Sequence, residues 1–337
     1  MDNHAGPQGR VRLSDVARMA GVSTATVSRV LSHPDMVAEA TRLAVAQALD
    51  RSGYRMNHAA RNLRKGRTGC VVALVPNLGN PFFAKILVGM GRELAAAGYD
   101  LLVADTQDQG SLPATLRRFL DPSRADGIIL LDGRASAAQL APGPDRPPVV
   151  LACEWIEDAA LPRVVLDNQR GAALAVTHLR ALGHRHIGVI GGPPANVLHQ
   201  ARLAGTRDAA QDLRLTLFPG DFSLQAGQAA ARHWLALAPA ERPGAVFAFS
   251  DEMACAFIAD LGRAGQRVPR DVSVVGFDDI ELASHLLPAL TTIRQPKRDL
   301  GRKAAQVVLA AIAGHEVAAV TRLEPQLMLR ETTAPPG

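Results

Sequence analysis

The stretch Ala20-Gly-Val-Ser-Thr-Ala-Thr-Val-Ser-Arg-Val-Leu31 decides the fold of the N-terminal part of the chain. Its glycine, Gly21, interrupts an apolar helical pattern, and Ser23 stands where the next helix needs an N-cap. The apolar residues that follow recur on one helical face, at Val27, Val30 and Leu31. The stretch therefore predicts the end of one helix, a tight turn and a second short helix.

Helical patterns flank this stretch on both sides. Before it, Leu13, Val16, Ala17 and Ala20 have the spacing of one apolar helix face. After it, a third helix is expected from about Ala38 to Ser52. Two short helices joined by a glycine-containing turn form a helix-turn-helix motif, although a plain helical hairpin would give the same pattern.

The outward face of the second helix carries small polar side chains and one arginine. In a helix-turn-helix protein this helix enters the major groove, where Arg29 is suited to guanine and Ala25 to thymine methyl groups. Hydroxyl groups nearby are suited to phosphate oxygens. The residues expected to contact DNA on this helix are Ser23, Thr24, Ala25, Thr26, Ser28 and Arg29.

The charge distribution also points to nucleic acid. Residues 1–68 contain eleven basic and five acidic residues, whereas the rest of the chain contains 26 basic and 27 acidic residues. The excess positive charge therefore lies in the segment with the helix-turn-helix pattern. A solubilising basic tail would instead be of low complexity, without this apolar periodicity.

Three motifs in this segment resemble the headpiece of the lactose/purine-repressor family of bacterial transcriptional regulators: Leu13-Ser-Asp-Val-Ala17, Ala20–Leu31 and Gly53-Tyr54. The resemblance implies that residues 57–68 form a hinge helix and linker, with Asn57, Arg61 and Leu63 at the DNA. In the family a leucine, here Leu63, wedges into the minor groove; such a wedge kinks the duplex.

From Gly69 onward, short apolar runs alternate with helical patterns, as in α/β proteins with buried parallel strands. We expect an all-α helix-turn-helix headpiece (residues 1–56) and an α/β body (69–337) of two doubly wound parallel-sheet lobes. Resemblance to the family implies a periplasmic-binding-protein-like body that also dimerises. The lobes are expected at about 69–162 with 294–319, and 163–293 with 320–337.

Polar residues follow the predicted strands, and ligands of open α/β sheets bind beyond these strand ends. They are Asn77, Asp105, Asp132, Glu154, Asp167, Asp251 and Asp278. For any single one of them, a helix N-cap or an Asx turn is the favoured role. Together they predict one cleft.

The family resemblance narrows the expected effector-binding residues to Phe82, Phe83, Asp167, Asn196, Arg202, Phe222, Asp251 and Asp278. Arginine and carboxylates suit neighbouring hydroxyl groups, and aromatic faces suit a sugar or a base. Asn196 lies near a position where the purine-responsive branch has arginine, which disfavours an acidic purine. Residues 167–207, Gly220-Asp-Phe-Ser223 and Gln295-Pro296 resemble the cytidine-responsive branch, so a nucleoside effector is expected, with a sugar as the alternative.

Other classes of protein fit the sequence less well. No apolar run reaches about 18 residues and no secretory signal opens the chain, so we expect a cytoplasmic protein without membrane contact. The dispersed Cys70, Cys153 and Cys255 predict neither disulfides nor a metal site. His184-Arg-His186 lacks zinc spacing, and Gly188-Val-Ile-Gly-Gly-Pro193 lacks both dinucleotide and P-loop signatures. We expect no cofactor and no catalysis.

The predicted function is therefore a homodimeric repressor that binds a palindromic operator in double-stranded DNA and responds to a small effector. The alternatives are a cytoplasmic small-molecule-binding protein, or an enzyme of nucleoside or sugar metabolism. A transport solute-binding protein would lack the basic headpiece. Induction and corepression both remain open.

Overall fold

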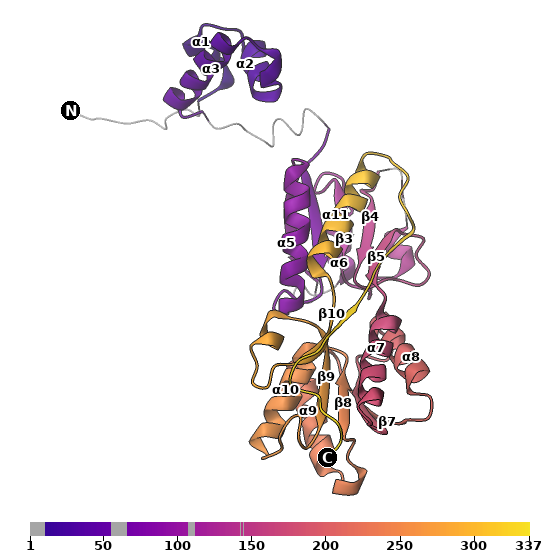
Figure 1. Ribbon diagram of the computed structural model, residues 1–337. Coiled ribbons are helices and arrows are strands. Elements are labelled where there is room, and N and C mark those ends of the chain that lie inside the picture. The colour runs from indigo at the N-terminus through magenta and orange to yellow at the C-terminus, as the bar shows by residue number, and fades with distance from the viewer. Residues whose placement is uncertain (1–10, 55–65, 107–111, 142, 144) are drawn as a thin grey trace, which may run out of the picture. The chain divides into compact units, whose positions relative to one another are not determined.

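The computed structural model describes residues 11–54, 66–106, 112–141, 143 and 145–337, which form two units divided between Gly66 and Arg67 (Figure 1). Asn57, Arg61 and Leu63 of the predicted hinge helix lie outside the described residues and remain predictions. None of the described helices is both long enough and apolar enough to span a bilayer.

The first unit is the predicted three-helix headpiece. Its helices are α1 (Leu13–Ala20), α2 (Thr24–Ser32) and α3 (Glu39–Ser52), with a 3₁₀ turn, η1 (Pro34–Met36), before the third. Gly21 adopts a left-handed φ of +67° that ends α1. Ser23 caps α2 by accepting a hydrogen bond from the backbone N–H of Thr26 at 3.1 Å. The predicted helix-turn-helix is thus confirmed.

The second unit contains two six-stranded sheets, as predicted. The first has the strand order β11-β5-β4-β3-β1-β2 and the second β12-β10-β9-β8-β6-β7. The first-sheet strands are β1 (Cys70–Val75), β2 (Asp100–Asp105), β3 (Gly127–Leu130), β4 (Val149–Ala152), β5 (Arg163–Leu166) and β11 (Val320–Leu323). The second-sheet strands are β6 (His186–Ile190), β7 (Arg214–Phe218), β8 (Ala245–Ala248), β9 (Ser273–Asp278), β10 (Thr291–Arg294) and β12 (Gln326–Met328). All neighbours pair in parallel except β10 and β12.

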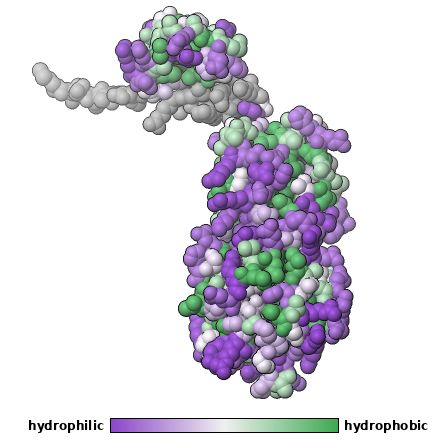
Figure 2. Space-filling view, viewed as in Figure 1, coloured by the Kyte–Doolittle hydropathy of each residue, from purple (hydrophilic) through white to green (hydrophobic). Residues whose placement is uncertain are grey.

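Helices cover both sheets. Those of the first lobe are α5 (Pro81–Ala96), α6 (Leu112–Phe119) and α11 (Lys297–Ile312), and those of the second are α7 (Asn168–Ala181), α8 (Val197–Ala210), α9 (Leu224–Ala236) and α10 (Asp251–Arg263). Short 3₁₀ turns are η2 (Ala137–Leu140), η3 (Pro239–Glu241) and η4 (Glu281–Ser284). Strands β3, β4 and β8 are wholly buried, which is why they read as continuous apolar runs. Hydrophilic residues cover most of the visible surface of the body, with hydrophobic residues gathered in smaller patches (Figure 2).

The chain passes between the lobes three times, after Leu166, after Arg294 and after Leu323. The predicted boundaries at residues 162 and 319 are therefore too early. Residues 163–166 pair with β4, and residues 320–323 pair with residues 163–166, so both strands extend the first sheet rather than the second. The crossover predicted near residue 293 falls within one residue of the end of β10.

Candidate nucleic-acid interface and effector cleft

Helix α2 presents most of the residues that the sequence assigned to DNA. Thr24, Ala25, Ser28 and Arg29 are exposed. The hydroxyl groups of Ser23 and Thr26 hydrogen-bond each other at 2.9 Å, so the helix cap already uses both. The Arg29 side chain makes no hydrogen bond or ion pair within the described headpiece, and its guanidinium is available to a ligand.

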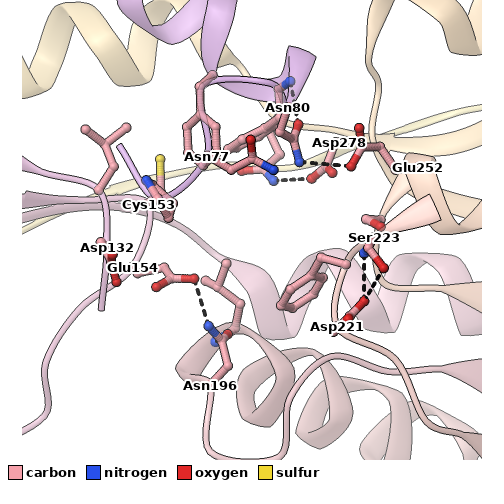
Figure 3. A pocket seen from close by; sticks show the side chains of 18 of the residues that line it. Asn77, Asn80, Asp132, Cys153, Glu154, Asn196, Asp221, Ser223, Glu252 and Asp278 are labelled. Carbon is pink, nitrogen blue, oxygen red and sulfur yellow. Dashed lines mark hydrogen bonds between the residues drawn. The ribbon is translucent and has the colours of Figure 1, made fainter. Parts of the chain in front are cut away.

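A cavity of about 450 Å³ lies between the two lobes of the body, at the carboxyl ends of their strands (Figure 3). Both lobes supply its walls, with aromatic, amide and charged side chains. They include Asn77, Asn80, Phe82, Phe83, Asp132, Arg134, Cys153, Glu154, Asn168, Asn196, Arg202, Asp221, Phe222, Ser223, Glu252, Asp278 and Gln295.

The structure brings six of the eight predicted effector residues to this cavity: Phe82, Phe83, Asn196, Arg202, Phe222 and Asp278. The other two, Asp167 and Asp251, do not line it. Asp167 caps α7 through the backbone N–H of Arg170 at 3.0 Å, with Arg322 3.6 Å from its other oxygen. Asp251 is fully buried behind the wall and accepts hydrogen bonds from Thr292 Oγ1 at 2.5 Å and Ile280 N at 2.8 Å.

The lining residues that the sequence reasoning missed include Asn168, Glu252 and Gln295. Two of them directly follow the aspartates that were chosen wrongly. In both places the aspartate ends the turn after a strand, and the next residue faces the cavity. Asp105 makes a similar local contact, accepting from the backbone N–H of Leu78 at 2.9 Å. Cavity-lining residues thus lie within one position of Asp167 and Asp251.

Arg202 is the principal cation of the cleft, and it is only 2 % exposed. Its Nε donates to Asn168 Oδ1 at 2.9 Å, and one terminal nitrogen donates to the carbonyl oxygen of Phe249. The guanidinium lies over the Phe277 ring, 3.7 Å from its centroid. Burial lowers the pKa of Arg202 to about 10, with Asp278 opposing the shift, so the group remains charged at neutral pH.

Asp278 stands opposite Arg202, with 4.0 Å between its Oδ1 and the nearest guanidinium nitrogen. The same oxygen accepts a hydrogen bond from Gln295 Nε2 at 2.7 Å. Burial raises the pKa of Asp278, while Arg202 and Lys297 lower it. The carboxylate also accepts a hydrogen bond from the backbone N–H of Asp251. A carboxylate has about four acceptor sites, so an effector hydroxyl group could still donate to it.

Two contacts join the lobes across the cleft. Asn196 donates to Glu154 Oε1 at 2.8 Å, and Asn80 donates to Glu252 Oε2 at 3.2 Å (Figure 3). Burial raises the pKa of both glutamates. Both of these contacts are neutral amide donors on carboxylates, which an effector with its own donors is able to replace.

Two clusters of titratable residues, the histidines of His184-Arg-His186 and the neighbouring Asp278 and Asp279, contact other parts of the protein. His184 Nε2 lies 2.9 Å from the Ala334 carbonyl oxygen, and His186 Nε2 lies 2.8 Å from Thr216 Oγ1. Asp278 and Asp279 diverge, because Asp279 accepts from Arg294 at 2.7 Å and from Arg330 at 2.5 Å. These side chains are thus engaged in contacts within the protein.

The Phe222 ring fits in the cleft because residue 192 is a glycine without a side chain. A Cβ atom at residue 192 would lie 2.2 Å from Cζ of Phe222 and within 2.8 Å of two more ring atoms. Phe222 itself has a left-handed φ of +69°, which leaves its backbone little freedom to follow.

We expect Gly192→Ala to weaken effector binding about tenfold, because the displaced ring loses its stacking contact with the effector. Isothermal titration calorimetry measures the change. Gly262→Ala is the matched control: a Cβ there meets nothing within 4 Å, and α10 should gain slightly in stability. Equal effector affinity in the two variants would contradict a role for the Phe222 ring.

Comparisons with known proteins cover both units. Residues 12–57 match the family of bacterial regulatory proteins called the lacI family, and residues 176–333 match a periplasmic binding protein-like domain. The HTH-type transcriptional repressor CytR of Escherichia coli (strain K12) is 36% identical over 328 residues, covering 95% of this chain and 96% of the relative. The repressor PurR of Photobacterium profundum is 34% identical over 331 residues, covering 95% and 98%.

Solved structures agree with this match. A lac repressor dimer bound to operator and the anti-inducer ONPF superposes with a TM-score of 0.84 at 28% identity, covering 96% of this chain and 99% of that one. A complex of the regulator CelR with cellobiose has a TM-score of 0.72 at 34% identity, covering 96% and 100%. From its headpiece to the end of its second lobe, the chain belongs to the LacI family of bacterial regulatory proteins.

Proposed function

We propose that this protein is an operator-binding transcriptional repressor whose affinity for DNA is controlled by a neutral, hydroxyl-rich effector. The proposal rests on two features of the same chain. Helix α2 exposes most of the side chains that are expected to contact DNA, and the cleft places Arg202 opposite Asp278. The relatives CytR and PurR are repressors. The similar lac repressor structure holds operator DNA and the anti-inducer ONPF, and the similar CelR structure holds cellobiose. The effector is a nucleoside, with a sugar as the second choice.

The charges of the cleft support a neutral effector. Five carboxylates and two arginines line the cavity. Arg134 is already paired with Asp132, 2.6 Å away, and Arg202 faces Asp278. No arginine or lysine of the described body forms an ion pair with Glu154, Asp221 or Glu252. A phosphate group would meet unpaired carboxylates and no free cation.

Backbone N–H groups at the helix N-termini beside the cleft could also bind an anion, but capping side chains already occupy them. Asn80, Asn196, Ser223 and Ser250 each cap the helix that follows them and accept hydrogen bonds from its first backbone N–H groups. These donors would otherwise suit an anion. The carboxylates and amides instead suit hydroxyl groups, and Phe82, Phe83 and Phe222 offer apolar faces to a ring.

A ligand panel tests this proposal. We expect cytidine or ribose to bind at least tenfold more tightly than cytidine 5′-monophosphate or ribose 5-phosphate, because each phosphate adds negative charge beside unpaired carboxylates. Thermal shift and calorimetry measure binding, and fluorescence anisotropy of a selected operator fragment measures the response of DNA affinity. Tighter binding of the phosphorylated partners would exclude a neutral effector.

We further infer that the protein acts as a homodimer on a palindromic site, since one helix-turn-helix reads only a few base pairs. The relative with the higher TM-score was solved as a dimer on its operator. We also infer that the cleft binds rather than catalyses. Its one thiol, Cys153, is buried, and burial raises its pKa, so it stays protonated and weakly nucleophilic. Turnover of a bound nucleoside would overturn this inference.

A further inference from the structure

Lys297 occupies an unusual place for a lysine. It is the first residue of α11, only 5 % exposed, and it does not line the effector cavity. Its ammonium donates hydrogen bonds to the carbonyl oxygens of Asp278 and, at 2.8 Å, Asp279. A buried ammonium is costly unless it is paired and hydrogen-bonded, so these contacts need an explanation beyond packing.

The turn that Lys297 holds is strained. Asp278 has a φ of +120° and Asp279 a φ of +53°, values that non-glycine residues rarely adopt. Arg294 and Arg330 hold the carboxylate of Asp279, but only Lys297 among the described side chains donates to both of the turn's carbonyl oxygens. Lys297 therefore holds the backbone from which the Asp278 side chain enters the cavity, while Gln295 holds its Oδ1.

Lys297 also lies at the junction of the two lobes. The turn ends β9 of the second sheet, whereas α11 packs side by side with α5 of the first lobe (Figure 1). The two helices approach so closely that a Cβ on Gly301 would lie 2.0 Å from the carbonyl oxygen of Ile86. The first turn of α5 presents Phe82 and Phe83 to the same cavity.

We propose that Lys297 is a positioning residue that fixes Asp278 in its effector-binding direction and ties it to helix α11 of the other lobe. The proposal rests on the proposed function, because it concerns how the cleft recognises its effector. If Asp278 moved on effector binding, Lys297 would move α11 with it, and with α11 the helix α5 that packs against it.

Lys297 also lowers the pKa of Asp278. The charged or titratable groups around Asp278 are Arg202 from α8, Asp251 and Glu252 from α10, Cys153 after β4 and Lys297 from α11. Burial raises the pKa of Asp278, and the two cations lower it. Without the lysine charge the pKa rises further, so a larger fraction of Asp278 is protonated as the pH falls. An ionised Asp278 accepts effector hydroxyl groups, and a protonated one accepts them less well.

Calorimetry on the full chain between pH 6 and pH 8.5 tests this role, with whichever of cytidine, adenosine, ribose and cellobiose binds wild type most tightly. We expect Lys297→Met to weaken binding at least tenfold at pH 7, and to weaken it more at pH 6 than at pH 8. Lys297→Arg should restore part of the affinity, and Lys303→Met on the same helix should behave as wild type. Wild-type affinity and pH profile in Lys297→Met would overturn the proposal.

A second measurement needs no substitution at Lys297 and decides the matter if Lys297→Met does not fold. The chain has four lysines, Lys65, Lys85, Lys297 and Lys303. With ¹³Cε-labelled lysine, and signals assigned through Lys65→Met, Lys85→Met and Lys303→Met, effector should shift the Lys297 signal and leave Lys303 in place. An unmoved Lys297 signal at saturation would refute the proposal. If wild type bound none of the four ligands, the proposed function would fail first, and this inference with it.

Discussion

Arg202→Ala is expected to abolish the response to effector while the headpiece still binds operator DNA. The substitution removes the donors to Asn168 and Phe249, and it leaves Asp278 without its facing charge. Hydrogen bonds to charged groups contribute roughly 1.5–3 kcal/mol each, so effector affinity should fall at least about 100-fold. Calorimetry measures the affinity, and operator anisotropy with saturating effector measures the response.

Two controls separate recognition from folding. Arg207→Ala removes an exposed arginine from the same helix and should leave effector affinity unchanged. Arg202→Lys keeps the charge but loses the planar guanidinium, which reaches Asn168, Phe249 and Asp278 together. This variant should therefore bind effector only slightly more tightly than Arg202→Ala. Breaking a buried pair destabilises a protein by roughly 3–5 kcal/mol, and thermal unfolding reports that separately. A full response in folded Arg202→Ala would remove Arg202 from the site.

Most of the fold was predictable because the central strands are buried on both faces. The runs that became β1, β3, β4 and β8 are apolar without interruption, and β6 is apolar after His186. The strands near residues 291, 320 and 326 were missed for opposite reasons. Thr291 and Thr292 are fully buried yet polar, so β10 gives no apolar run. Strand β11 lies at a sheet edge, and its residues alternate between exposed and half-buried.

The sequence predicted that strand ends form the cleft, but not which of two neighbouring residues faces it. A strand-end aspartate suits a ligand and a helix cap equally well, and the outcome depends on where the helix begins. Asp167 caps α7 and Asn168 faces the cavity. Asp251 turns inward because Gly276 leaves room for it: a Cβ there would lie 2.2 Å from Asp251 Oδ1. Such packing involves residues distant in sequence, and no local pattern reveals it.

Arg29→Ala is expected to weaken binding to the selected operator about 10- to 100-fold and to leave effector affinity unchanged. Arg29 is exposed on α2, and its side chain makes no hydrogen bond or ion pair within residues 11–54. A bidentate arginine–guanine contact discriminates against the wrong base by roughly 1–3 kcal/mol. Anisotropy titrations with the operator and with a scrambled duplex, at one fixed salt concentration, measure both affinities.

The matched control is Arg51→Ala, which removes the same charge from an exposed position in the last turn of α3. The loss of a phosphate contact weakens binding to operator and scrambled DNA by the same factor. It also lowers the slope of log affinity against log salt concentration by about one. The loss of a base contact weakens binding to the operator alone, because a scrambled duplex does not present the matching guanine at that position. If Arg29→Ala reduced both affinities equally, as expected for Arg51→Ala, Arg29 would be a phosphate contact, and base recognition would have to come from other residues of α2.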